Sequence, residues 1–584
     1  MSQPILSSRP SDEISDSEEP LLSGRIKQQI RRDKWTQLVL FVWAVVATVG
    51  VVVVSVFYQN AGNEPAQTKF PPSGKRNVIF MVSDGMGPTS LHVTRSWKQY
   101  TDDLPYDKTL FLDKHIIGTS RTRSSNSLVT DSAAGATAFS CGKKSYNGAI
   151  SVLPDHSPCG TVLEAAKKAG YKTGLVVTTR ITDATPACFS AHVNMRSEED
   201  RIAEQQIGDY PLGRVVDLML GGGRCHFLPS STPDGESCRN DDRDIINEAQ
   251  TKFGFSYVSN RAGFDTLHKG KNVSLPLLGL FAKTDIPYEI DRKDKDYPAL
   301  WEMAEAAITA LSDATKDSDQ GFFIMVEGSR IDHAGHANDP VAQVREVLAY
   351  DKTFKKMVEW AEKSDVQTVV VSTSDHETGG LTAARQLHAE YPDYLWYPSV
   401  LNNATHSGEY LATQLATFPH LDDEKKLDRF IRKEILVEGL GVLDASEDEV
   451  KRLKDTKTSA SYTLSDIVSR RAQIGWTTHG HSGVDVNIYG IGPALAKLSG
   501  NHENTDIGKF IRDYLELDLE AITKELTHKG IKNADEDLSW MGKSLADITE
   551  NPNWITNQVD CYHGEFKREV RGVLHPCAHQ PHPQ

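Results

Sequence analysis

Four apolar runs that stand beside acidic and histidine residues constrain the fold of this chain more than any other feature. The segments are NVIFMVSDGMG (77–87), GFFIMVEGSRIDHAGHAND (321–339), VQTVVVSTSDHETGG (366–380) and GHSGVDVNIYGIG (480–492). Short apolar runs bounded by turn residues are typical of strands buried on both faces of a mostly parallel sheet. Sites in such open sheets lie just beyond the carboxyl ends of the strands. We therefore expect these acids and histidines to converge on one edge of the sheet.

Helical patterns between the runs complete the predicted fold class. They cover residues 161–169, 298–314 and 340–363 and alternate with the predicted strands. This alternation predicts an α/β fold, a doubly wound, mostly parallel sheet flanked by helices. The stretch between His376 and His481 is too long for a simple connection, so we expect an inserted subdomain over about residues 381–475 of a catalytic domain that covers 75–560.

One serine stands at the start of a run of very small residues, TDSAAGATA (130–138). Small side chains let a bulky inorganic group approach the hydroxyl of Ser132. The Ala-rich run predicts a helix whose N-terminus holds Ser132, where free N–H groups and the helix dipole favour an anion. Taken alone, the segment better suits a tightly packed helix start capped by Thr130 or Asp131, and it is the rest of the chain that favours a functional serine.

The residue types near the predicted strand ends suit metal ions. Asp and His together favour zinc, and a site with three protein ligands keeps one position open for substrate. Hard oxygen donors suit magnesium instead. The candidate ligands form three groups: Asp332, His336 and His481; Asp84, Asp375 and His376; and Glu327 with Thr185, beside Asp84.

These segments resemble the motifs of alkaline phosphatases over nearly all of the chain after about residue 75. TDSAAGATA is similar to the nucleophile motif, and DGMG, DATPA, VEGSRIDHAGHA, TSDHETGG and HSG occur in the order of the family. The resemblance implies that Ser132 becomes phosphorylated, that the first two ligand groups each hold a zinc ion, and that one magnesium ion is bound by the third group with Asp183 in or next to its shell.

The resemblance also implies which residues face the phosphate. Arg196, thirteen residues after Asp183, corresponds to the arginine that clasps it, with Arg180 as the rival, because a guanidinium binds two phosphate oxygens as a fork. His333 resembles the animal-type residue that faces the phosphate, whereas Asp183 resembles the bacterial-type residue near the third metal. This mixture leaves the metal preference of the third site and the pH optimum open.

The function predicted from these residues is hydrolysis of small phosphate monoesters through a phosphoserine at a site with two zinc ions and one magnesium ion. The alternatives are a phosphodiesterase or sulfatase of the same superfamily, or a non-catalytic membrane glycoprotein on this fold. The net charge of −16 argues against nucleic acid as a stable partner, because phosphate backbones favour basic surfaces.

The N-terminal region is organised as a membrane anchor. Residues 1–34 predict a disordered cytosolic tail that ends in basic residues, 35–59 a transmembrane helix and 60–74 a stalk. The positive-inside rule then places the catalytic body across the membrane, although a cleaved signal peptide is the alternative. Leu21 and Leu22 resemble an acidic dileucine signal that a sorting adaptor reads, which predicts delivery to the vacuole.

The remaining expectations concern covalent features and assembly. Seven cysteines in an oxidising lumen leave at least one free thiol, and we expect disulfides Cys225–Cys238 and Cys561–Cys577, with Cys141 as a buried free thiol. Sequons at Asn272 and Asn403 fit a luminal body. Residues 561–584 form a His- and Pro-rich tail. In the resembled family the insertion packs at a dimer interface, so a homodimer is expected.

Overall fold

The strands of the chain build one large sheet in a computed structural model that describes residues 19–61, 70, 74–528 and 538–543. Its ten strands lie in the order β14-β2-β13-β8-β1-β7-β3-β4-β6-β5. Their bounds are β1 (Arg76–Val82), β2 (Ile116–Arg121), β3 (Lys172–Arg180), β4 (Leu218–Gly222), β5 (Ser256–Val258), β6 (Leu277–Leu280), β7 (Phe322–Glu327), β8 (Gln367–Thr373), β13 (Val486–Ile491) and β14 (Gly500–Glu503). Within the described residues, only β13 runs antiparallel to its neighbours in this sheet. The predicted doubly wound, mostly parallel sheet is confirmed.

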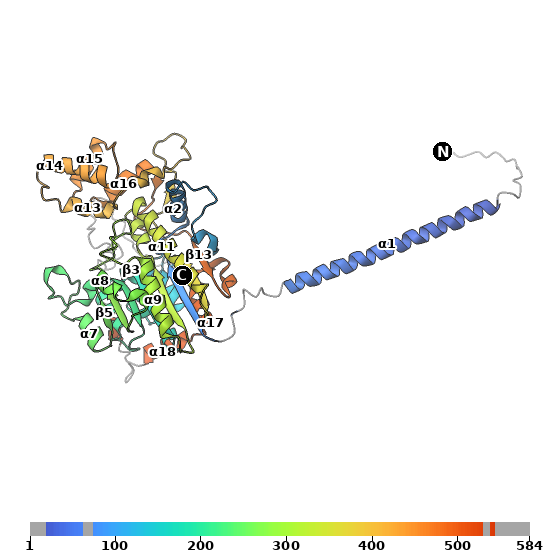
Figure 1. The fold of residues 1–584 in the computed structure, drawn as a ribbon, viewed down its shortest axis with the longest axis horizontal. Coiled ribbons are helices and arrows are strands. Elements are labelled where there is room, and N and C mark those ends of the chain that lie inside the picture. Colours follow the sequence, from blue (N-terminus) through green and yellow to red (C-terminus); the bar gives the residue numbers. More distant parts are fainter. Residues whose placement is uncertain (1–18, 62–69, 71–73, 529–537, 544–584) are drawn as a thin grey trace, which may run out of the picture. The chain divides into compact units, whose positions relative to one another are not determined.

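Helices cover both faces of the sheet (Figure 1). Alternate residues of β1 point into two hydrophobic clusters, Phe80 into one and Ile79 into the other, because successive side chains of a strand point to opposite faces. The helices of the body are α2 (Pro88–Thr101), α3 (Ser132–Cys141), α4 (Val162–Lys168), α5 (Ala184–Ser190), α6 (Glu199–Ile207), α7 (Ile245–Thr251), α8 (Arg261–Asp265), α9 (Leu300–Ala314), α10 (Arg330–His336), α11 (Pro340–Ala361), α17 (Asn504–Leu515) and α18 (Leu519–His528). The three helices predicted from the sequence correspond to α4, α9 and α11.

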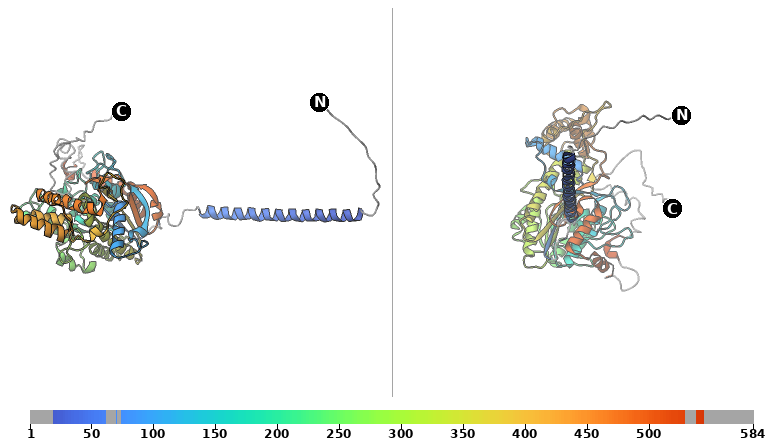
Figure 2. Two further views of the ribbon diagram at one scale, coloured as in Figure 1. Left: turned by 90° about the horizontal axis from the view of Figure 1, so that it is seen from above. Right: turned by 90° about the vertical axis from the view of Figure 1, so that its right-hand side faces the viewer.

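The segment predicted as an insertion forms its own helical layer. Its helices are α12 (Ser399–Asn402), α13 (Gly408–Ala416), α14 (Glu424–Phe430), a π-helix (Ile431–Gly439), α15 (Glu447–Asp455) and α16 (Ser461–Ala472). They share a third hydrophobic cluster that packs on Trp97 of α2 and Val344 of α11. Helices α13 to α16, coloured orange, lie together at one end of this unit in Figure 1, and Figure 2 shows them from two further sides.

The described part of the N-terminal unit is one long helix, α1 (Glu19–Ala61). Its segment Arg31–Val53, 23 residues long, is apolar enough to cross a membrane by length and composition. The prediction of a disordered tail over residues 1–34 is wrong from Glu19 onwards. Leu, Arg, Lys, Gln and Ile fill most positions between Leu21 and Lys34, and these residues extend a helix readily from an apolar segment that is already helical.

The cysteines confirm one expectation and correct another. Cys225 and Cys238 form the expected disulfide. Cys141 is not a free thiol: it is bonded to Cys159, and the free cysteine among the described residues is the buried Cys188. Cys141 is the last residue of α3, and the chain returns to it just before α4. The expected pair Cys561–Cys577 lies outside the described residues.

Candidate functional site

The carboxyl ends of three adjacent strands bring the predicted acids together. Asp84 follows β1, Glu327 ends β7, and Asp375 follows β8. His481 precedes β13, so it reaches the same edge because β13 is antiparallel to β8. A small ribbon of β9 (Glu377–Thr378) with β12 (His481–Ser482) fixes it there, next to His376. A second ribbon joins β10 (Thr382–Ala383) and β11 (Ile474–Gly475).

Asp84, Asp375 and His376 form the first buried ligand group. Their candidate ligand atoms all lie within 4.8 Å of one another. His376 Nε2 lies 3.2 Å from Asp375 Oδ2 and 3.6 Å from Asp84 Oδ1. The three side chains are almost entirely inaccessible to solvent.

Asp332, His336 and His481 form the second ligand group, directly beside the first. The Nε2 atoms of His336 and His481 are 3.1 Å apart, and they lie 3.3 and 3.6 Å from the Asp332 carboxylate. Asp332 and His336 share one face of α10, as the four-residue spacing predicts. The rings of His376 and His481 stack with centroids 3.5 Å apart, so the two groups are contiguous.

Buried oxygens without partners show that these residues suit cations. Within the described residues, Asp84 Oδ1, Asp332 Oδ2 and Asp375 Oδ2 are buried without a hydrogen bond of acceptable geometry. A buried carboxylate without a partner is costly, whereas two ligands held about 2.0 Å from one tetrahedral ion lie roughly 3.3 Å apart, close to the spacings observed. The donor set and its geometry therefore fit two zinc-type sites.

The electrostatics of the edge lead to the same conclusion. Burial raises the pKa of Asp84 well above its ordinary value, and the charges of Asp375 and Asp332 raise it further. Burial raises the pKa of Glu327 to about 8, partly offset by the hydroxyls of Ser329 and Thr185. Despite their burial, the pKa values of Asp332 and Asp375 are lowered by His336 and His376 respectively. The two acids whose pKa values are raised indicate a site built to neutralise carboxylates with bound cations.

Ser132 lies at the N-terminus of α3, as predicted. Asp131 caps the helix by accepting the Ala134 N–H at 2.9 Å. Ser132 is 1% exposed, and its Oγ lies 3.0 Å from His376 Nε2. The helix packs tightly against the metal-type ligands, since a Cβ added at Gly135 would lie 3.0 Å from Asp375 Cβ. This close approach explains the small residues of the motif.

The two candidate arginines occupy different environments. Arg196 lies beside the nucleophile motif, with its terminal nitrogens 3.4 Å from Asp131 Oδ2 and 3.0 Å from Asp183 Oδ1. Arg180 is instead enclosed by three carboxylates, those of Asp183, Glu199 and Asp285, at 2.8 to 3.0 Å. The geometry favours Arg196 as the arginine next to Ser132.

The remaining predicted residues lie around this edge. Asp183 caps α5, and Thr185 belongs to that helix. The charge of Asp183 contributes to the raised pKa values of Asp84 and Glu327, which places the three acids within electrostatic reach. His333, on α10, is fully buried, and its Nδ1 accepts a hydrogen bond from Arg330 Nε at 3.2 Å.

Sequence reasoning missed the groups that orient the ligands. Thr378 donates a hydrogen bond to Asp332 Oδ1, and its hydroxyl lies 3.2 Å from His376 Nδ1. His481 Nδ1 lies 2.7 Å from the Thr130 carbonyl oxygen, which leaves Nε2 for a cation. Thr378 was visible within the TSDHETGG motif, but nothing in the sequence distinguished it from its neighbours.

The fold and site define an α/β protein with adjoining groups of metal-type ligands at one edge of its sheet, beside a serine at a helix N-terminus. The family model for alkaline phosphatase matches residues 75–517. The chain is 55% identical over 504 residues to repressible alkaline phosphatase of Saccharomyces cerevisiae, covering 83% of this chain and 88% of that protein. It is 49% identical over 474 residues to alkaline phosphatase of Schizosaccharomyces pombe, with 80% and 87% covered.

Solved structures agree with the sequence comparisons. Alkaline phosphatase of Thermus thermophilus superposes with a TM-score of 0.64 at 27% identity, covering 78% of this chain and 95% of that one. The cold-active enzyme of Shewanella sp. gives a TM-score of 0.62 at 28% identity, with 75% and 99% covered. The chain belongs to the alkaline phosphatase family, which is metal-dependent.

Proposed function

We propose that this protein is an alkaline phosphatase that hydrolyses phosphate monoesters through a phosphoserine at Ser132. One observation carries the proposal: Ser132 Oγ, at a helix N-terminus, lies 3.0 Å from a histidine of a buried ligand group that adjoins a second such group. A helix N-terminus stabilises the negative charge of an incoming phosphate.

The residue types of the ligand groups support the following placement of ions. Asp332, His336 and His481 would hold one zinc, and Asp84, Asp375 and His376 the other. The oxygen-rich corner formed by Asp84, Asp183, Thr185 and Glu327 suits magnesium. When bound, the two zinc ions lower the pKa of the nucleophile and stabilise the charge that develops on the leaving oxygen.

The chain itself positions the substrate and the nucleophile. Asp131 and Asp183 hold Arg196 from two sides, so its guanidinium is aimed as a fork for two phosphate oxygens. Ser132 Oγ attacks phosphorus and the alcohol departs, which leaves a phosphoserine. Water then attacks the phosphoserine and releases phosphate. Two displacements at phosphorus give net retention of configuration. His333, next to Asp332 on α10, is the residue that we assign to face the phosphate.

The test is hydrolysis of an aryl phosphate monoester, a diester and a sulfate ester by the full-length protein, with and without chelator. We expect chelator-sensitive turnover of the monoester and a phosphate trapped on Ser132. Ser132→Ala should nearly abolish turnover, whereas Ser125→Ala, an exposed serine seven residues earlier, should not. Preferential turnover of the diester or the sulfate would support those members of the superfamily instead. No turnover of any ester would support a non-catalytic glycoprotein.

We further propose that the protein is a type II membrane protein of the vacuole. Arg31, Arg32 and Lys34 are basic residues at the N-terminal end of the segment Arg31–Val53, and the next Lys or Arg along the chain is Lys69. This asymmetry keeps the N-terminus in the cytosol. Asn272 and Asn403 are exposed, as glycosylation in a lumen requires. Loss of a glycan when both are changed to Gln would support this topology, and unglycosylated wild-type protein would contradict it.

Sorting and assembly complete the proposal. The pair Leu21 and Leu22 follows two acids and suits a sorting adaptor in the cytosol. Vacuolar delivery should be lost when both leucines are changed to Ala, and unaltered delivery would remove the signal. The helical layer of residues 381–475 exposes Tyr391, Tyr394 and Leu395, which suits a homodimer interface. Light scattering of the detergent-solubilised protein measures this directly.

A further inference from the structure

Residues 538–543, near the C-terminal end of the described chain, pack against the loop that carries Arg196, and we call them the strap. Met541 is its buried centre. This side chain is 1% exposed and shares a hydrophobic cluster with Ala149 and Val152. Burial of the apolar side chain fixes the strap on the body of the protein.

Hydrogen bonds attach the strap to residues on both sides of Arg196. Asn194, two residues before Arg196, donates a side-chain N–H to the carbonyl oxygen of Lys543 at 2.9 Å. Glu198, two residues after Arg196, accepts the backbone N–H of Lys543 at 3.0 Å. A single residue of the strap therefore joins the two ends of the segment 194–198.

A third attachment lies where this loop begins. Gln205, buried on α6, donates to the carbonyl oxygens of Trp540 and His192, both at 3.1 Å, and accepts the His192 N–H at 2.7 Å. The rings of Trp540 and His192 meet edge-on, with centroids 5.9 Å apart. Since His192 comes four residues before Arg196, the strap also holds the start of the loop.

The strap supports the turn that binds the Arg196 backbone as well. Gly148 accepts the Arg196 N–H at 2.7 Å, and its own N–H donates to Asp131 Oδ2 at 2.9 Å. Ala149, the next residue, packs on Met541 of the strap. Because Asp131 also binds the Arg196 guanidinium, the backbone and the side chain of Arg196 are tied to one unit that the strap contacts.

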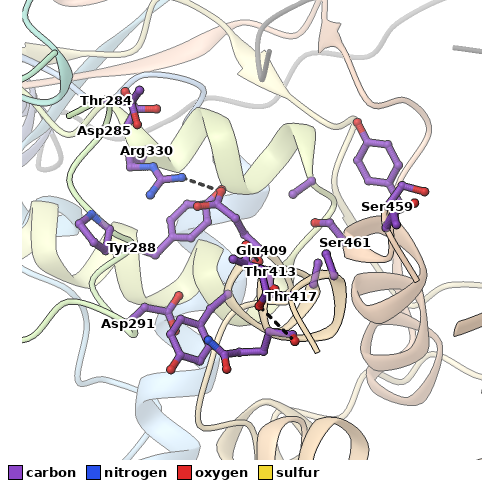
Figure 3. A pocket seen from close by; sticks show the side chains of 18 of the residues that line it. Thr284, Asp285, Tyr288, Asp291, Arg330, Glu409, Thr413, Thr417, Ser459 and Ser461 are labelled. Carbon is purple, nitrogen blue, oxygen red and sulfur yellow. Dashed lines mark hydrogen bonds and ion pairs between the residues drawn. The ribbon is translucent and has the colours of Figure 1, made fainter. Parts of the chain in front are cut away.

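The opposite side of Arg196 is near a cleft. Asp183 holds the Arg196 guanidinium at 3.0 Å and is itself held by Arg180 at 3.0 Å. Arg180 and Asp285 line a cleft of about 830 Å³ between the body and the insertion (Figure 3). The strap therefore packs on the Arg196 loop through buried contacts, whereas the Asp183 side leads to this cleft.

We infer that the strap is a positioning element for Arg196: it holds the segment 194–198 so that the guanidinium fork meets the phosphate oxygens. The inference rests on the proposed phosphomonoesterase function and adds residues that act on its phosphate affinity through Arg196. A loop released from the strap occupies positions in which the fork is misplaced. The apparent affinity for phosphate then falls with the fraction of molecules whose loop is in the competent position.

Gly542→Ala tests the inference by releasing the strap. Gly542 has a φ of +90°, which favours glycine, and an added Cβ would collide with Glu198 Oε2. The phosphate inhibition constant and the KM for nitrophenyl phosphate should both rise about fivefold, the effect of one lost hydrogen bond, with kcat nearly unchanged. The matched control is Gly500→Ala, which adds the same backbone strain at a φ of +98° but places its Cβ in open space, and its inhibition constant should equal the wild-type value.

Two further comparisons separate positioning from general support of the fold. Met541→Ala removes the packing on Ala149 and should raise the phosphate inhibition constant, whereas Met541→Leu, of similar volume, should retain the wild-type value. In an Arg196→Lys background, Gly542→Ala should have no further effect on the inhibition constant, because the fork that the strap positions is gone.

A lower kcat with unchanged KM and inhibition constant, as a loss of folded protein would give, would overturn the inference. An equal rise of the inhibition constant in Gly500→Ala would do the same, and so would a full further rise in the Arg196→Lys background. Failure of the wild type to hydrolyse nitrophenyl phosphate would instead overturn the proposed function itself.

Discussion

Replacing Arg196 and Arg180 by lysine, one at a time, separates phosphate binding from structural support. Both arginines bind Asp183, at 3.0 Å each, so distance to that acid does not distinguish them. Arg196 also contacts Asp131, which directly precedes Ser132. The other guanidinium nitrogens of Arg180 instead form ion pairs with Glu199 and Asp285. Only Arg196 has its fork beside the nucleophile.

The expected magnitude for Arg196→Lys follows from the hydrogen bonds lost. Lysine keeps the charge but gives up one arm of the fork, and a hydrogen bond to a charged group contributes about 1.5–3 kcal/mol. Since 1.4 kcal/mol is a factor of ten, kcat/KM should fall and the phosphate inhibition constant should rise by roughly 10- to 150-fold. The melting temperature should fall less than in Arg180→Lys, because Arg196 pairs with two carboxylates rather than three.

Arg180→Lys should show the opposite pattern. Lysine cannot satisfy three buried carboxylates at once, and unpaired buried charge is strongly destabilising, so the variant should lose roughly 2 kcal/mol of stability. Its phosphate inhibition constant should stay within about twofold of the wild-type value, because a residue outside the binding site affects stability and phosphate binding independently. Inhibition assays and thermal unfolding of both variants are the measurements. If Arg180→Lys weakens phosphate binding and Arg196→Lys does not, the assignment of Arg196 is wrong.

Four further outcomes are expected. Cys159→Ser should cost roughly 3 kcal/mol, the chain-entropy value for a loop of 18 residues, seen as a lower melting temperature; equal stability would mean that the Cys141–Cys159 bond does not form. Burial raises the pKa of Glu346 to about 7 from an ordinary value near 4.5, so the wild type loses stability as the pH rises through that window. Denaturant unfolding at pH 5 and pH 8 should therefore show that the free energy of unfolding of Glu346→Gln rises relative to that of the wild type, by up to roughly 3 kcal/mol, at the higher pH. The same difference between variant and wild type at both pH values would contradict this. His333→Lys places a fixed cation beside the phosphate and should tighten phosphate inhibition and slow turnover above about pH 8, where histidine is mostly neutral; weaker inhibition would mean that His333 does not face the phosphate. Dialysis against a chelator should lower the melting temperature as well as abolish activity, because the acids at the sheet edge then repel one another, and calorimetry of the dialysed protein is the check.

The parts of the site that follow strands could be predicted from the sequence. Asp84, Glu327 and Asp375 each come at or just after an apolar run, and parallel strands bring their carboxyl ends to one edge whatever their order in the sheet. The helix position of Ser132 followed from composition in the same way. Such inferences need only local periodicity and the direction of the strands.

Features that depend on distant contacts could not be predicted. The Cys141–Cys159 bond requires the chain to return to the end of α3, and no local pattern at either cysteine encodes that approach. The sequence also left Arg196 and Arg180 as rivals, because both flank Asp183 and both are arginines. The choice between them depends on how many acids surround each side chain, which only the packed structure provides.

The net negative charge of the chain and its cluster of buried acids explain why phosphate binding at this site would depend strongly on bound cations. Besides the net charge of −16, the edge of the sheet gathers Asp84, Glu327, Asp332 and Asp375, all buried, around the candidate nucleophile. A phosphate dianion would be repelled by such an edge, and Arg196 is already shared between two aspartates, one of which directly precedes Ser132. Attraction of substrate must therefore come from ions held by those same carboxylates. Metal occupancy and substrate binding are consequently one electrostatic property of this fold rather than two separate ones.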